Sequence, residues 1–186
     1  MIAIIDCGTS ELEYIQSNLH DLWYRFRVIL LDELKDADFS LDLWVIISGA
    51  PTLLTQIDRV TFLEPFFFIR TMHIPILGIC LGHQIIGLLH GAEIFREKYI
   101  EKMEEIKVIE RNILFAGIAQ STYFQEAHSE YITLPEGFVH LARSASCENE
   151  AMKHPSKNIF GTQFHPEISG ENGARIFRNF LGICVW

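Results

Sequence analysis

The sequence is poor in cysteine and lacks long apolar stretches. Four cysteines occur among 186 residues, and their spacing matches neither a metal site nor a disulfide framework: Cys7, Cys80, Cys147 and Cys184. No apolar run approaches the roughly 18 residues that a membrane span requires. Residues 1–6 also lack the basic start and long apolar core of a signal peptide. We therefore expect a cytoplasmic protein whose thiols stay reduced.

Basic residues are also scarce. The 15 lysines and arginines are outnumbered by 24 aspartates and glutamates, which gives a formal net charge of -9. This balance argues against the broad basic surface that is typical of nucleic-acid binding. The acidic residues of one stretch are interleaved with lysines, which favours a solvated face over a binding site: Glu97, Glu101, Glu104, Glu105 and Glu110.

Repeats, low-complexity segments and linkers are absent from the sequence as well. Hydrophobic residues make up 49% of the chain and charged residues 21%, as in ordinary globular proteins. We expect residues 1–186 to form a single domain, because a chain of 186 residues can bury a substantial core.

Strand and helix patterns alternate in the first half of the chain. Short apolar runs predict strands at 2–6, 26–31, 43–48 and 74–79, and apolar residues at helical spacing predict helices at 11–22, 55–72 and 81–89. The second half predicts shorter, more polar strands at 93–111, 120–127, 138–144 and 159–164, followed by a helix at 172–181. The pattern favours an α/β, flavodoxin-like fold: a mostly parallel central sheet with helices on both faces, plus a small antiparallel extension.

The most informative segment is 76–84, in which a cysteine stands between two glycines. It is typical of a strained turn from a strand into a helix, because Gly78 and Gly82 leave no Cβ where the two elements crowd together. The turn would project the side chain of Cys80 into open space at a helix N-terminus. There the free N–H groups and the helix dipole favour a thiolate. Cys80 is therefore the candidate nucleophile.

A nucleophilic thiol needs a base, and the base needs a group that orients it. The predicted strand at 159–164 runs directly into His165, Pro166 and Glu167. Active sites of open α/β sheets form beyond the carboxyl ends of parallel strands, which is where Cys80 and His165 would meet. Pro166 stiffens the backbone between the imidazole and the carboxylate. We therefore predict a catalytic triad of Cys80, His165 and Glu167.

These segments, together with the Ser-Gly-Ala-Pro loop at 48–51, resemble the triad-type (class I) glutamine amidotransferase domain. The resemblance extends from residue 1 to the last predicted helix, with the motifs in the family's order. It implies that Cys80 attacks the side-chain amide of glutamine and that His165 passes the thiol proton to the leaving ammonia. Water then hydrolyses the glutamyl thioester to glutamate.

The resemblance also assigns residues around the nucleophile. It implies an oxyanion hole made by the backbone N–H of Leu81 and that of Gly49 or Ala50. Two positions match those that hold glutamine in the family, one in the helix and one in a loop that recognises the amino-acid end: Gln84, and His128 with Ser129. No metal is implied.

Ala50 departs from the family, which usually has a second glycine at this position. If position 50 requires a positive φ, alanine would cost roughly 1 kcal/mol or more there. The hypothesis is that Ala50 turns a carbonyl of the loop into the site, so that the enzyme is weak without its partner.

Ammonia from such a domain normally feeds a synthase, and this chain has no phosphate-binding glycine loop with a lysine. A separate ATP-dependent subunit is therefore implied. ATP and Mg²⁺ are expected on that partner, and no cofactor is expected here. Segment 127–138 is most similar to the glutaminase subunit of GMP synthetase, which predicts amination of XMP to GMP.

Other acceptors remain open. Segment 80–84 is more similar to the glutaminases of anthranilate synthase and carbamoyl phosphate synthetase, and segment 169–173 to that of imidazole glycerol phosphate synthase. A stand-alone amidotransferase and a non-catalytic relative that only binds a partner are further alternatives. Four phenylalanines of the predicted helix at 55–72 are interpreted as core residues, with a docking face as the alternative: Phe62, Phe66, Phe67 and Phe68.

Overall fold

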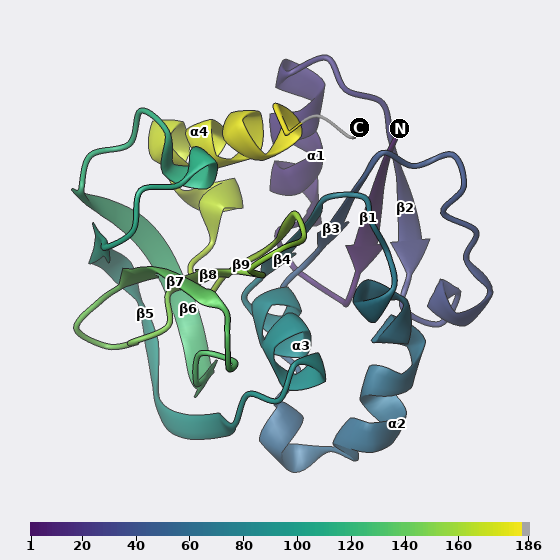
Figure 1. Ribbon diagram of the computed structural model, residues 1–186, viewed down its shortest axis with the longest axis horizontal. Helices are drawn as coiled ribbons and strands as arrows, with labels where there is room; N and C mark the ends of the chain where they lie inside the picture. Colours follow the sequence, from purple (N-terminus) through teal and green to yellow (C-terminus); the bar gives the residue numbers. More distant parts are fainter. Residues whose placement is uncertain (184–186) are drawn as a thin grey trace.

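The computed structural model describes residues 1–183, so Cys184 lies outside the described residues. Five parallel strands form the centre of the sheet: β1 (Ile2–Asp6), β2 (Phe26–Leu30), β3 (Trp44–Ile47), β4 (Ile76–Ile79) and β9 (Ile159–Thr162). Antiparallel strands extend it: β5 (Ile94–Val108), β6 (Ser121–Ile132), β7 (Val139–Arg143) and β8 (Ala151–Lys153). The order across the nine-stranded sheet is β2-β1-β3-β4-β9-β8-β7-β5-β6 (Figure 1).

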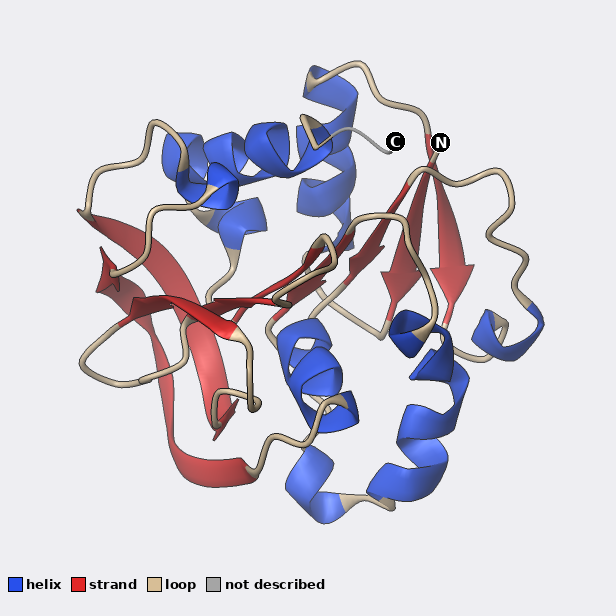
Figure 2. Ribbon diagram, viewed as in Figure 1, coloured by secondary structure: helices blue, strands red, loops and turns tan. Residues whose placement is uncertain are grey.

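Helices cover both faces of the parallel strands (Figure 2). One face carries α1 (Leu12–Asp21) and α4 (Gly170–Leu181), and the other carries α3 (Leu81–Leu89) and α2 (Arg59–Leu63). Successive strand residues point to opposite faces, so two buried cores result. One core includes Ile4, Ile46 and Phe160, and the other includes Ile5, Ile47 and Ile159. The predicted flavodoxin-like α/β fold with an antiparallel extension is confirmed.

The predicted helix at 55–72 is wrong in detail. The chain there forms a 3₁₀ turn at Leu54–Gln56, the short helix α2 and a 3₁₀ helix at Glu64–Arg70. Asp58 begins α2 by accepting a hydrogen bond from the N–H of Val60, and Pro65 interrupts the α-helical pattern because it has no N–H to donate. Phe66 is fully buried in the core, whereas Phe67 is 48% exposed.

Two strands also differ from the prediction. β6 continues to Ile132 instead of ending at 127, so that His128 and Ser129 lie in a strand and not in a loop. β8 has only three residues and was not predicted, because so short a run carries no periodic signal.

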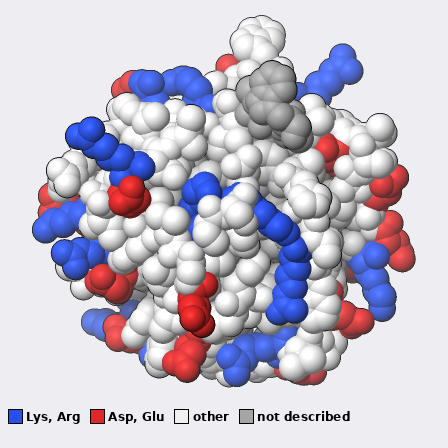
Figure 3. Space-filling model, viewed as in Figure 1, with Lys and Arg blue, Asp and Glu red and all other residues white. Residues whose placement is uncertain are grey.

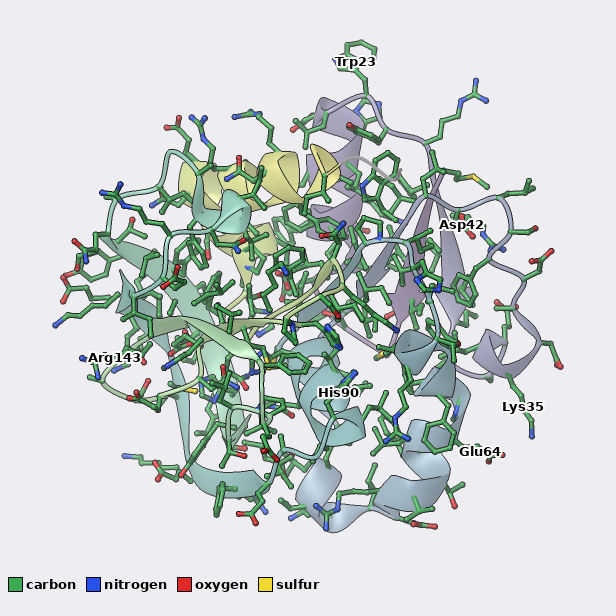
Figure 4. All side chains as sticks on the ribbon, viewed as in Figure 1. Trp23, Lys35, Asp42, Glu64, His90 and Arg143 are labelled. Atoms are coloured by element: carbon green, nitrogen blue, oxygen red, sulfur yellow. The ribbon has the colours of Figure 1, made fainter. Side chains whose placement is uncertain are left out.

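The surface mixes acidic and basic side chains over the face that Figure 3 shows. Of the five glutamates expected on a solvated face, Glu104 is buried instead, where Lys102 Nζ lies 3.2 Å and Ser146 Oγ 2.5 Å from its Oε2. Trp23, in contrast to the buried Glu104, is 92% exposed and projects outward beyond α1 (Figure 4). Within residues 1–183, no helix is both long and apolar enough to cross a bilayer.

Candidate active site

Cys80 lies at the turn between β4 and α3. Its φ of 49° and ψ of -101° fall outside the regions that residues with a Cβ ordinarily occupy. A Cβ at Gly78 would lie 2.4 Å from the backbone of Gly82, and a Cβ at Gly82 would lie 2.4 Å from the carbonyl oxygen of Ile47. Both glycines are therefore required by close approach, and the strained turn predicted from them is confirmed.

The strand register brings His165 to the same edge of the sheet. β4 and β9 pair in parallel, with Ile79 opposite Thr162, and the N–H of Cys80 donates to the carbonyl of Thr162 over 2.8 Å. His165 follows β9 by three positions and is fixed by its own N–H, which donates to the carbonyl of Gln125 over 2.8 Å. The carboxyl ends of the two strands thus present the thiol and the imidazole together.

Glu167 orients the imidazole ring. The short 3₁₀ turn at Pro166–Ile168 places its Oε1 2.7 Å from His165 Nδ1, and both side chains are buried. Burial opposes a charge on the ring, but the sulfur of Cys80 and the Glu167 carboxylate outweigh it and raise the pKa of His165 well above its ordinary value. The Nε2 atom of His165 has no hydrogen-bond partner among the described residues.

The thiol has two polar neighbours besides His165. Gln163 Nε2 lies 3.5 Å from Cys80 Sγ, and the carbonyl oxygen of Ala127 lies 4.0 Å from it. Gln163 Oε1 in turn accepts a hydrogen bond of 3.1 Å from Gln84 Nε2, which also donates to the carbonyl of Glu130 over 2.9 Å. The side-chain amide of Gln84 is thus engaged within the protein.

The loop after β3 packs against Cys80 and His165. A Cβ at Gly49 would lie 3.2 Å from His165 Cε1 and 3.4 Å from Cys80 Cβ, so the backbone of Gly49 approaches both side chains. Ser48 Oγ accepts from the N–H of Cys7 over 2.9 Å and donates to the carbonyl of Gly49 over 2.9 Å. The N–H of the same peptide unit, that of Ala50, points the opposite way because the unit is planar and trans.

The structure removes the proposed strain at Ala50. Among the described residues, only Trp23 and Cys80 combine a side chain with a positive φ, so Ala50 is not strained. The carbonyl of Gly49 accepts a hydrogen bond from the Ser48 hydroxyl over 2.9 Å. Alanine is therefore compatible with the conformation of this loop.

Two cavities meet at the thiol. One, of about 320 Å³, is lined by the loop after β3, by Gln84 and by residues 127–130 of β6. The other, of about 360 Å³, is lined by the turn at 8–11 and by His165. Cys80, Ala50 and Tyr99 belong to both linings. A larger cavity of about 440 Å³ lies at 108–120 and contains none of the predicted site residues.

The three predicted glutamine-binding residues all border the first cavity, but the ring of His128 is buried. Gln84 and Ser129 line the first cavity. His128 also borders it, but its ring is buried with Nε2 3.1 Å from Glu126 Oε2, without hydrogen-bond geometry. In the described part of the chain, no cluster of His, Cys, Asp and Glu is arranged to hold a metal ion.

Sequence reasoning missed three buried polar residues: Gln163, Glu130 and Glu126. Gln163 stands directly before the Phe-His-Pro-Glu segment, and its proximity to the predicted base was the available signal. Glu130 and Glu126 gave none, because a glutamate in a polar strand is normally solvated, yet they are 2% and 0% exposed.

Comparison with known proteins identifies the family. The model of the class-I glutamine amidotransferases matches residues 3–184. The chain belongs to this family. Class-I amidotransferases hydrolyse glutamine, so this chain is a glutamine-hydrolysing amidotransferase enzyme.

Three relatives of this chain carry the same name, a subunit of GMP synthase. The chain is 38% identical to a subunit of the glutamine-hydrolysing GMP synthase of Pyrococcus furiosus over 191 aligned residues, covering 99% of this chain and 98% of that protein. The corresponding protein of Methanosphaera stadtmanae is 44% identical over 75% of this chain and 74% of that protein. A crystal structure from Thermoplasma acidophilum, provisionally assigned to the same GMP synthase subunit, has a TM-score of 0.89 at 28% identity, covering 98% and 92% of the two chains. These relatives are each named as one subunit of a GMP synthase.

Proposed function

We propose that this amidotransferase hydrolyses glutamine through Cys80, His165 and Glu167. Cys80 Sγ attacks the amide carbon of the glutamine side chain while His165 accepts the thiol proton. His165 then returns the proton to the leaving nitrogen, ammonia departs, and water hydrolyses the thioester to glutamate. The observation that carries the proposal is the strained turn that presents Cys80 beside His165. The imidazole of His165 is oriented by Glu167, whose Oε1 lies 2.7 Å from His165 Nδ1.

The oxyanion of the tetrahedral intermediate needs preorganised donors. Leu81 is the first residue of α3, so its N–H has no acceptor within the helix. The N–H groups of Gly49 and Ala50 donate no hydrogen bond within the described residues, and the N–H of Ala50 points opposite to the Gly49 carbonyl that accepts from Ser48. We assign the donors to Leu81 and Ala50, with Gly49 allowing the loop to approach the thiol.

We assign one cavity to the amino-acid end of glutamine and the other to the leaving nitrogen. The amino-acid end of glutamine would occupy the cavity lined by Gln84, Ser129 and the backbone at His128. The leaving nitrogen must face His165 to receive its proton, and His165 lines only the second cavity. Glutamine and the leaving ammonia would therefore occupy two adjoining cavities that meet at Cys80.

The ammonia acceptor is proposed from the relatives. Those described above are subunits of GMP synthases, so we propose that this chain, as one glutaminase domain, delivers ammonia to a separate ATP-dependent subunit that aminates XMP to GMP. ATP and Mg²⁺ would bind to that partner.

The test is a reconstitution of the full chain with the ATP-dependent subunit of the same cell. The mixture should make GMP from XMP, ATP and glutamine. Cys80→Ala should block glutamine as the nitrogen source but not free ammonia, whereas Cys147→Ala, which changes another buried thiol, should support both. Glutamine hydrolysis without amination of XMP would refute this acceptor alone. Hydrolysis by the Cys80→Ala variant would refute the proposed nucleophile.

A further inference from the structure

Glu130 is a buried carboxylate on β6 that is bonded to the loop after β3. It is 2% exposed. Its Oε2 accepts from the N–H of Leu54 over 2.7 Å, and its Oε1 accepts from the N–H of Thr55 over 3.0 Å and from the Thr55 hydroxyl. Charge-assisted bonds of this kind are stronger than neutral ones. One side chain therefore fixes the beginning of the 3₁₀ turn at Leu54–Gln56.

The loop between β3 and this turn is hydrogen-bonded near its two ends. At the first end, the N–H of Ser48 donates to the carbonyl of Ile5 over 3.0 Å and its hydroxyl bonds to Cys7 and Gly49. At the second end, Glu130 holds Leu54. Between them, the N–H groups of residues 49, 50, 52 and 53 donate no hydrogen bond within the described chain. Apart from the packing of Ala50 against the core, the two ends supply the hydrogen bonds that hold this segment.

The backbone of Glu130 is bonded to a second element of the site. Its carbonyl accepts from Gln84 Nε2, which bridges to Gln163 and so to Cys80 Sγ. Gln84 lies one helical turn after Cys80 on α3. A single residue of β6 is therefore hydrogen-bonded both to α3, which carries Leu81, and to the end of the loop that carries Ala50.

We propose that Glu130 is a positioning residue for the oxyanion hole. Its carboxylate holds the loop so that the N–H of Ala50 stays within reach of the oxyanion whose other donor is Leu81. The proposal rests on the glutaminase mechanism above and extends it to a group that does not contact the reacting atoms. Loss of the carboxylate moves one donor and leaves the thiol, imidazole and Glu167 where they are.

Glu130→Gln tests the proposal in the full chain with its synthase subunit. The amide can accept from one N–H but presents its own NH₂ to the other, so the loop shifts while the side-chain volume is kept. Removal of a whole oxyanion donor costs about 10²–10³ in kcat, so displacement should lower glutaminase kcat about 10–100-fold and change KM by less than about threefold. A kcat within about twofold of wild type in the folded variant would overturn the proposal.

Covalent labelling separates positioning of the loop from damage to the nucleophile. A glutamine-analogue chloroketone needs the oxyanion hole and should modify Cys80 more slowly in Glu130→Gln by a similar factor. Iodoacetamide needs only the thiolate and should react at the wild-type rate. An equal loss of both rates would overturn the proposal. Glu105→Gln is the matched control, because it changes a carboxylate of the neighbouring strand whose partner is the exposed Ser121 hydroxyl.

Two further measurements keep the test decisive. If Glu130→Gln does not fold, Glu130→Asp, which shortens the reach of the carboxylate, must show the same fall in kcat at constant KM, and unchanged kinetics would overturn the proposal. If the wild type hydrolyses no glutamine, the proposed function fails, and hydrogen exchange still tests the anchor. The amides of Leu54 and Thr55 must then exchange at least about tenfold faster in the variant, and unchanged exchange would refute the anchor itself.

Discussion

Glu126→Gln is expected to stabilise the protein at alkaline pH. Glu126 and Glu150 are both fully buried, and each carboxyl group is a neighbour of the other. Burial raises the pKa of Glu126 to about 8, and burial with the neighbouring Glu126 charge raises the pKa of Glu150. His128 offers no compensating charge, because burial lowers its own pKa. The two carboxyl groups therefore retain protons that exposed glutamates release.

The sign of the pH effect follows from this retention. Between pH 4.5 and about 8, the folded protein keeps a proton on Glu126 that the unfolded chain has lost, so the free energy of unfolding falls as the pH rises through this window. A shift from 4.5 to about 8 corresponds to about 5 kcal/mol at about 1.4 kcal/mol per unit. Structural relaxation and sharing of a proton with Glu150 reduce this, and we expect about 2 kcal/mol.

Urea unfolding at pH 6 and pH 9 measures the effect. Glutamine mimics the protonated acid, so Glu126→Gln should match wild type within about 1 kcal/mol at pH 6 and exceed it by about 2 kcal/mol at pH 9. Glu105→Gln, which removes an exposed carboxylate, should have the same urea unfolding curve as the wild type at both pH values. Parallel curves for wild type and Glu126→Gln would show that Glu126 is ionised in the folded state and would refute the reasoning.

Three further outcomes concern the catalytic site. A glutamine-analogue chloroketone should modify Cys80 selectively, because burial raises the pKa of Cys7 to about 12; a peptide map with equal labelling of the cysteines would contradict this. His165→Ala should lower glutaminase kcat by about 10³ or more, and Glu167→Gln by less, since the proton acceptor remains; near-normal turnover of the first variant would rule out the triad. Ala50→Gly should leave kcat within about twofold, because Ala50 has no positive φ; a large rise would show that alanine restrains the loop.

The strained turn at Cys80 and the pairing of His165 with Glu167 could be predicted from the sequence because their signals are local. Glycines on both sides of Cys80 indicate a close approach of backbones, and the structure places the two elements at that distance. His165, Pro166 and Glu167 adjoin in the chain, so their geometry depends on one short turn. Alternation of strands and helices likewise predicts the parallel half of the sheet.

Features that depend on distant contacts could not be predicted. Glu130 bonds to residues 75 and 76 positions away, so these bonds could not be predicted from its own segment. The same holds for Glu126, whose burial results from strands that pair only in the folded sheet. The break at Pro65 is different, since a proline inside a helical pattern is a local signal of a helix boundary.

The conformation of Cys80 has a consequence for the history of this chain. A side chain at φ 49° and ψ -101° costs of order 1–3 kcal/mol that glycine would not incur. The fold alone would therefore favour glycine at position 80, and only the need for a sulfur at the turn keeps cysteine there. In a descendant relieved of catalysis, replacement of Cys80 by glycine would improve stability, so position 80 would be among the first to change.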